Sequence, residues 1–136
     1  MFGSSSGYFQ PRAETAKIFG CNTSIEKGHE LAKSEIFSRC KSHLDDADIV
    51  IALLDASQVD DGTAWEIGYF YARKSSEQKI IGVRTDFRRA GESSGAMVNA
   101  MIEGSCDWVV RTREELMETI SLFFNTSAVR EKKNDL

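Results

Sequence analysis

The chain has 136 residues, of which 41% are hydrophobic, and a formal net charge of -4. This length supports one domain with a buried core and is too short for two ordinary domains. The charges are mixed, and no Lys/Arg block that could follow a phosphate backbone appears before the short C-terminal tail, so the composition argues against a nucleic-acid partner.

The three cysteines are Cys21, Cys40 and Cys106. They are odd in number and far apart, without CxxC spacing or a nearby histidine pair, so we expect reduced, buried thiols and no metal site. No apolar run approaches the roughly 20 residues that span a bilayer, and the first residues lack a basic region followed by an apolar core. We therefore expect a cytoplasmic protein that needs no cofactor and has no membrane partner.

The first half of the chain contains one clear helix and one clear strand. Residues 1–7 are rich in Ser and Gly and are expected to be flexible, and residues 7–10 are a candidate short strand. Residues 20–24 have the composition of a loop, and the apolar spacing after them predicts a helix over about 24–46. The run Asp48–Leu54 is apolar on both faces, which is typical of a central parallel strand.

The second half alternates helices with short apolar strands. We predict helices over 63–74, 96–103 and 112–124, the last with a Thr112/Glu115 capping box, strands over 79–83 and 107–110, and an Arg-rich polar loop over 85–95. The polar tail 125–136 is expected to be disordered.

Alternating strands and helices are typical of a parallel sheet that is covered by helices on both sides through right-handed crossovers. The sequence therefore predicts a single three-layer α/β domain over residues 8–124. Because such sheets usually have about five strands and only three strong ones are visible, either the sheet is small or an element is missing.

Two carboxylates lie where the helix after the central strand begins. Asp60 is on the loop and Glu66 is predicted in the first helical turn, so both can face one cleft at the strand ends, where α/β proteins bind ligands. The helix N-terminus should lower the pKa of Glu66, which suits a nucleophile, while Asp60 is better placed to give a proton. Such pairs cleave glycosidic bonds, through a covalent intermediate when the groups are close.

A second interpretation stays open at this point, because acidic residues at a helix start often only cap the helix and complement its dipole. The glycines nearby have their own predicted roles. Gly62 should allow close backbone approach, and Gly68 should let the helix pack tightly on the sheet.

At these residues the chain resembles the nucleoside 2-deoxyribosyltransferase family. The resemblance covers about residues 37–110, and its motifs are specific in combination. They are the strand Asp48–Asp55, the pattern Asp60-x-Gly-Thr-Ala-Trp-Glu66-Ile-Gly68, then Thr85-Asp86-x-Arg88, and Asn99-x-Met101.

The resemblance implies a Rossmann-like or flavodoxin-like fold and a covalent reaction. By matching position, Glu66 would attack C1′ of a 2′-deoxynucleoside and hold a deoxyribosyl ester, and Asp60 would contact and protonate the leaving base. A second free base, or water, would then take the sugar. Asn99 and Met101 match residues that reach into a neighbouring subunit's pocket, the asparagine at the sugar's 5′ side, which implies a homo-oligomer. The substrate-binding residues so implied are Gly62, Asn99, Met101 and Asp55.

Two departures from the family pattern bear on the function. Cys40 stands where family members commonly carry an aspartate, and the family's first strand is not found, because residues 7–12 resemble its second strand. Two other functions therefore stay open. Relatives that hydrolyse deoxynucleoside 5′-monophosphates carry a serine near the position of Asn99, and the arginines of the 85–95 loop favour such an anionic substrate. A non-catalytic nucleotide-binding domain is the other possibility.

Overall fold

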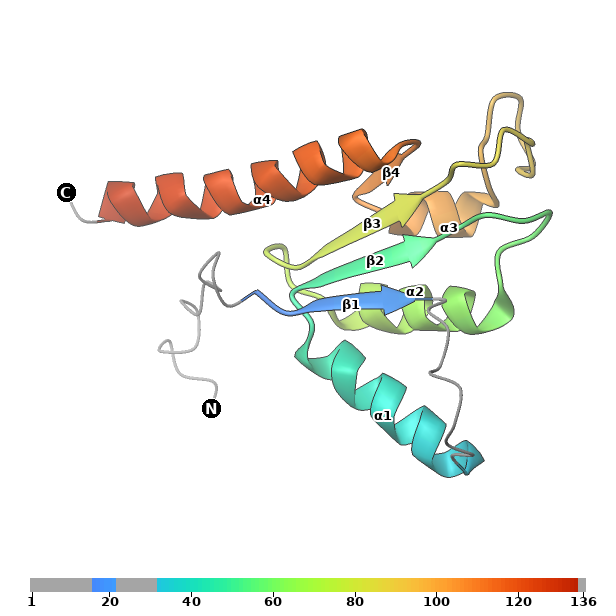
Figure 1. The fold of residues 1–136 in the computed structure, drawn as a ribbon, viewed down its shortest axis with the longest axis horizontal. Helices are drawn as coiled ribbons and strands as arrows, with labels where there is room; N and C mark the ends of the chain where they lie inside the picture. Colours follow the sequence, from blue (N-terminus) through green and yellow to red (C-terminus); the bar gives the residue numbers. More distant parts are fainter. Residues whose placement is uncertain (1–15, 22–31, 135–136) are drawn as a thin grey trace.

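The computed structural model describes residues 16–21 and 32–134, and it has four strands and four helices in that part of the chain (Figure 1). In chain order these are β1 (Ile18–Cys21), α1 (Lys33–Asp46), β2 (Ile49–Leu53), α2 (Asp61–Arg73), β3 (Lys79–Val83), α3 (Ala100–Ser105), β4 (Trp108–Val110) and α4 (Arg113–Asn134). None of the helices described there is long and apolar enough to cross a membrane.

The four strands form one parallel sheet in the order β1-β2-β3-β4, which confirms the predicted α/β class. The register places Cys21 beside Ala52, and Ala52 beside Gly82. Gly82 has to lack a side chain, because a Cβ there would lie 2.6 Å from Leu54 Cδ1 and 3.1 Å from Cys106 Sγ. This row of small residues gives the helices above it room close to the sheet.

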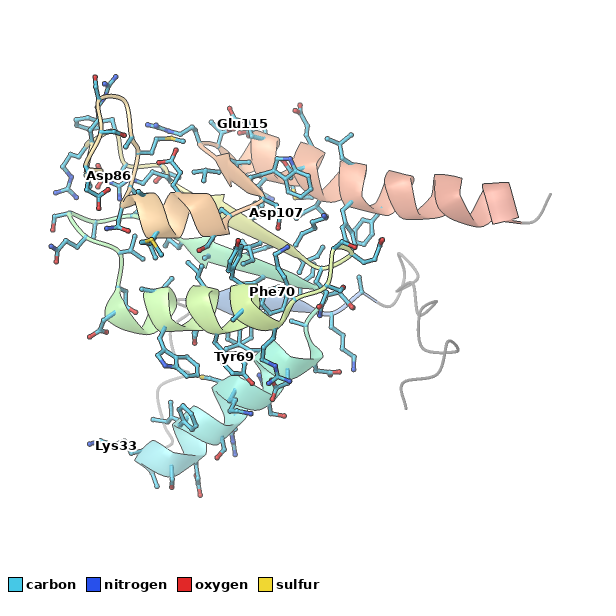
Figure 2. The ribbon with its side chains drawn as sticks, turned by 180° about the vertical axis from the view of Figure 1, so that it is seen from behind. Lys33, Tyr69, Phe70, Asp86, Asp107 and Glu115 are labelled. Carbon is cyan, nitrogen blue, oxygen red and sulfur yellow. The ribbon has the colours of Figure 1, made fainter. Side chains whose placement is uncertain are left out.

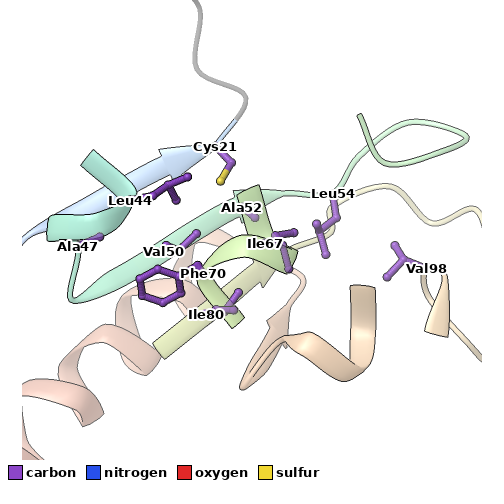
Figure 3. Packing of buried hydrophobic residues seen from close by; sticks show 10 residues of the cluster. All are labelled: Cys21, Leu44, Ala47, Val50, Ala52, Leu54, Ile67, Phe70, Ile80 and Val98. Atoms are coloured by element: carbon purple, nitrogen blue, oxygen red, sulfur yellow. The ribbon is translucent and has the colours of Figure 1, made fainter. Parts of the chain in front are cut away.

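Helices cover both faces of the sheet, as predicted. One face packs against α1, α2 and the α3 region in a cluster of ten buried residues (Figure 3): Cys21, Leu44, Ala47, Val50, Ala52, Leu54, Ile67, Phe70, Ile80 and Val98. The other face packs against α4 through Ile49, Ile81, Val110 and Phe123. In the described part of the chain, α1, α2 and α3 therefore lie on one side of the sheet and α4 on the other (Figure 1).

Helices α1 and α2 are joined by polar and aromatic contacts at their outer surfaces. The Tyr69 hydroxyl donates to Asp45 Oδ1 at 2.5 Å, and Figure 2 shows Tyr69 on the side of α2 that faces α1. The Trp65 ring stacks on Tyr69 with centroids 5.1 Å apart and meets the Phe37 ring edge-on. Trp65 is 48% exposed, while Tyr69 packs against the buried cluster, so these rings extend from the core to the surface.

The structure corrects the predicted bounds of several elements. Residues 20 and 21, predicted as loop, end strand β1, while the candidate strand at 7–10 lies outside the described residues. Helix α1 begins only at Lys33, because Ala32 is extended at ψ 148°. The prediction of one continuous helix from residue 24 to 46 is therefore wrong at Ala32. Residues 24–31 lie outside the described part of the chain.

The other corrections concern the ends of α3 and α4. Helix α3 begins at Ala100 instead of 96, because the Asn99 side chain accepts a hydrogen bond from Met101 N and caps the helix there. The predicted Thr112 cap on α4 is confirmed, since Thr112 Oγ1 accepts from Glu115 N at 3.1 Å. That helix continues to Asn134, well past its predicted end at 124.

Candidate functional site

The carboxyl ends of the four parallel strands meet at one edge of the sheet, and the loops that follow them carry most of the predicted site residues. The β2–α2 loop carries Asp55 and Asp60, and the loop after β3 leads to Asn99 at the start of α3. This is the edge at which open α/β sheets bind their ligands.

Asp60 caps helix α2. Its Oδ2 accepts from Thr63 N at 3.0 Å and from Thr63 Oγ1 at 3.3 Å, and its own carbonyl accepts the first helical bond from Ala64 N. The helix therefore begins at Asp61, two residues before the predicted start. Asp60 is exposed, and within the described residues its second carboxylate oxygen has no hydrogen-bond partner. Capping and a chemical role are thus compatible in this residue.

Glu66 lies in the second turn of α2, not in the first turn as predicted, and its side chain is half-buried. Burial raises the pKa of Glu66, the Cys21 thiol lowers it by hydrogen bonding, and the negative charge of Asp60 raises it further. The net shift is upward. The predicted lowering by the helix N-terminus is therefore wrong, because that effect falls off within the first turn and desolvation dominates beyond it.

Two thiols lie beside Glu66. Cys21 ends strand β1 in the buried cluster (Figure 3), and burial together with the neighbouring Glu66 raises the pKa of its thiol. Cys40 comes from α1, and burial and the charge of Glu66 raise the pKa of its thiol as well. Sequence reasoning assigned no site role to Cys21, because residues 20–24 were predicted to be a loop.

No cation neutralises Glu66 among the residues that the structure describes: none of the Lys, Arg or His side chains there forms an ion pair with it. Its surroundings are the two thiols and the exposed carboxylate of Asp60. A half-buried carboxylate without a cationic partner is a stronger base than an ordinary surface glutamate.

Asn99 and Met101 line a separate cleft of about 670 Å³ between the start of α2 and α3, and Glu66 is not one of the residues around it. Met101 is 78% exposed at its rim. The Asn99 amide nitrogen donates to Glu92 Oε1 at 2.6 Å, and Glu92 also accepts from Ala100 N at 2.9 Å. Within one chain the structure thus does not bring Asn99 and Glu66 to the same pocket.

Asp55 and the glycines have structural surroundings. The Asp55 carboxylate accepts from Thr85 N at 2.8 Å, from Thr85 Oγ1 and from Asp86 N at 3.0 Å, which ties the β2–α2 loop to the loop after β3. A Cβ on Gly62 would lie 3.1 Å from Asp60 Oδ2, so a side chain there would crowd the capping carboxylate. Gly68 is exposed, and a Cβ added there would have no atom within 4 Å. The prediction that this glycine lets the helix pack tightly on the sheet is therefore wrong.

Sequence reasoning expected Arg84, Arg88 and Arg89 near a pocket rim; Arg84 does line the cleft beside Asn99, whereas Arg88 is paired within its loop. Arg84 is fully buried. Arg88 pairs with Asp86, which lies in the loop beyond the end of β3 (Figure 2), and this pairing holds the pKa of Asp86 far below its usual range. Within the described ranges, no group of three or more His, Cys, Asp or Glu side chains is arranged to hold a metal ion.

Known proteins resemble this chain in sequence and in fold. A family model described as nucleoside 2-deoxyribosyltransferase matches residues 13–101, which is more than half of the chain. No curated protein matches the sequence. Among solved structures, a conserved protein from Enterococcus faecalis V583 is similar with a TM-score of 0.52 and 24% identity, over 74% of this chain and 73% of that one. At this identity the likeness shows the fold alone.

Proposed function

Because the chain belongs to the nucleoside 2-deoxyribosyltransferase family, we propose that it cleaves the N-glycosidic bond of a 2′-deoxynucleoside through a covalent ester on Glu66. The observation that carries this proposal is the half-buried Glu66 carboxylate, which has Asp60 and two thiols beside it and no cationic partner in the described part of the chain. A structural glutamate in such a place would be expected to have a cation or several donors around it.

The proposed reaction has two steps. In the first, a Glu66 carboxylate oxygen bonds to C1′ of the sugar, the bond from C1′ to the base nitrogen breaks, and the departing base takes the proton of Asp60, which enters this step as the neutral acid. In the second, a free base attacks C1′, the ester bond breaks, and Asp60 recovers a proton from the incoming base. Water in place of the second base would make the protein a hydrolase.

The raised pKa of Glu66 is opposite to the lowering expected at a helix start, and a nucleophilic role then requires that substrate binding finds the carboxylate ionised. A more basic carboxylate forms a stronger bond to an electrophilic carbon, provided that it is ionised when the substrate is bound. Partial burial also removes water that would otherwise have to leave before the attack.

The contacts of the loop after β3 support a free nucleoside over a 5′-monophosphate. Arg88 is already paired with Asp86, and the Glu92 carboxylate lies against Asn99, where a phosphate beside that asparagine would meet a like charge. Comparing kcat/KM for a deoxynucleoside and for its 5′-monophosphate tests this preference.

The proposed function is tested by incubating the protein with a deoxynucleoside and a second free base and following the exchanged nucleoside by chromatography. We expect exchange with the wild type and a loss of about 10³-fold or more in both Glu66→Ala and Glu66→Gln. Mass spectrometry of the denatured wild type should show a deoxyribosyl adduct that maps to Glu66.

The matched control is Glu114→Gln, which removes a carboxylate from the exposed first turn of α4 and should keep full activity. Free base without exchanged nucleoside would indicate hydrolysis by the same site. Neither product from correctly folded wild type, while calorimetry shows that it binds the nucleoside, would leave only the non-catalytic binding domain.

A further inference from the structure

Arg84 occupies an unusual position for a charged residue. It follows β3, and it is the largest fully buried side chain among the residues described. Its guanidinium donates to three backbone carbonyls: Nη1 to Leu54 O and to Ala56 O, the second at 2.7 Å, and Nη2 to Arg88 O at 2.9 Å. Arg84 therefore links the end of β2 to the loop after β3.

Burying this cation is costly. Arg84 forms no ion pair within the described part of the chain, and its Nε is buried without a hydrogen-bond partner. Asp55 and Asp86 compensate the charge of Arg84 only through space. The pKa of Asp55 is lowered, because its hydrogen bonds outweigh the effect of burial, and the pKa of Asp86 is lowered mainly by Arg88. The charge of Arg84 makes a small further contribution to both. A buried, incompletely satisfied arginine costs stability that an apolar side chain would not.

What Arg84 holds is the first half of the β2–α2 loop. Ala56 has a φ of 103°, a left-handed conformation that an alanine adopts only when its surroundings enforce it. The Arg84 bond to the Ala56 carbonyl provides that enforcement. At its other end the loop finishes in Asp60, which is fixed by its bonds to Thr63 at the start of α2. The loop is thus pinned at both ends.

We propose that Arg84 is a positioning residue of the active site, which fixes the β2–α2 loop so that the Asp60 carboxylate stays beside Glu66. The proton transfer by Asp60 that this serves rests on the proposed function, whereas the positioning itself does not. A lysine cannot replace the arginine, because three carbonyls at different angles need the planar fork of a guanidinium, and an ammonium on a flexible chain bonds them poorly.

The test is the pKa of Glu66, followed by NMR in protein with ¹³C-labelled glutamate carboxyl groups and assigned with Glu66→Gln. Burial raises this pKa most and the charge of Asp60 adds to it, so release of the loop, which lets water in and Asp60 move away, should lower it. We expect a lower Glu66 pKa in Arg84→Lys and in Arg84→Met than in the wild type. Arg84→Lys keeps the positive charge and serves if Arg84→Met does not fold.

The matched control is Val110→Ala, which removes methyl groups from the buried cluster on the opposite face of the sheet. It should lower the melting temperature, because it leaves a cavity in that cluster, and it should leave the Glu66 titration unchanged. An unchanged Glu66 pKa in a folded Arg84 variant overturns the positioning role, and so does an equal fall in Val110→Ala.

Kinetics separate this proposal from the proposed function. If the wild type exchanges bases, kcat of Arg84→Lys should fall by about 10²-fold with KM little changed, because a misplaced proton donor affects the chemical step more than binding. A rise in KM at constant kcat would contradict positioning of Asp60. If the wild type has no activity but the Glu66 titration shifts as expected, the enzymatic proposal fails and the positioning role stands.

Discussion

The half-buried carboxylate of Glu66 should make the folded protein less stable as the pH rises. Its pKa is raised above the ordinary value of 4.5 in the folded state, so the folded chain binds this proton more tightly than the unfolded chain. The stabilisation is complete below pH 4.5 and is lost as the pH rises through the folded pKa. Glu66→Gln removes this loss.

We therefore expect Glu66→Gln to melt no higher than the wild type at pH 4 and about 1 to 2 °C higher at pH 8, a small effect because the side chain is partly exposed. Differential scanning calorimetry across this range measures it, and Glu114→Gln should show no such trend. If the difference in melting temperature between Glu66→Gln and the wild type does not grow with rising pH, the burial of this carboxylate is contradicted.

The individual residues of the site were partly predictable from sequence. Asp60 and Glu66 could be found because they sit in one short motif beside a strongly apolar strand. Their environment could not, since it depends on Cys21 and Cys40, which come from other elements. The direction of the Glu66 pKa shift was mispredicted for this reason: sequence shows distance from a helix start, and only the fold shows burial.

At the scale of elements, helix α2 depends on Asp60 as its N-cap, and this allows capping and catalysis to be measured separately. Asp60→Asn should cap α2 about as well as the aspartate, because asparagine is an equally good N-cap, while Asp60→Ala should lose about 1 kcal/mol of unfolding free energy. Neither variant can donate the proposed proton. Urea denaturation measures the stabilities and the exchange assay the activities.

In the proposed mechanism both Asp60 variants lose most of their exchange activity, although only Asp60→Ala loses stability. Full activity in Asp60→Asn with a drop only in Asp60→Ala would show that Asp60 serves the helix alone. This was the second interpretation that the sequence left open.

Elements with an apolar pattern of their own were predictable, even the three-residue β4, whereas β1 and several helix ends were not. Strand β2 and helix α2 have clear patterns over their whole length. Strand β1 has only four residues, one of them a glycine, and becomes a strand through its pairing with β2. The start of α3 was misplaced because the capping asparagine was interpreted through the family motif and not as a helix signal.

At the scale of the whole molecule, the separation of Asn99 from Glu66 within one chain leads to a prediction about shared sites. If Asn99 completes the site of a neighbouring subunit, Glu66→Ala and Asn99→Ala are each inactive alone. When they are unfolded together and refolded, mixed dimers contain one complete site. Random pairing makes half of the dimers mixed, so we expect about a quarter of the wild-type activity.

The control mixes Glu66→Ala with Glu66→Gln, which cannot form a complete site in any combination. Activity in Asn99→Ala alone, or no recovery in a mixture that size-exclusion chromatography shows to be oligomeric, would contradict a shared site.

The strand order also has a consequence for where a ligand can enter. Each crossover from β1 to β4 steps the same way across the sheet, so α1, α2 and the α3 region lie on one face. Open α/β sheets form their crevice where the direction of winding reverses and neighbouring helices part to opposite faces. No reversal occurs within the strands described, so such a crevice needs a further strand at an edge of the sheet, and at the β1 edge it would lie beside Cys21 and Glu66. If the proposed function holds, a segment at that edge would form the second wall of the entrance and so bear on which bases fit.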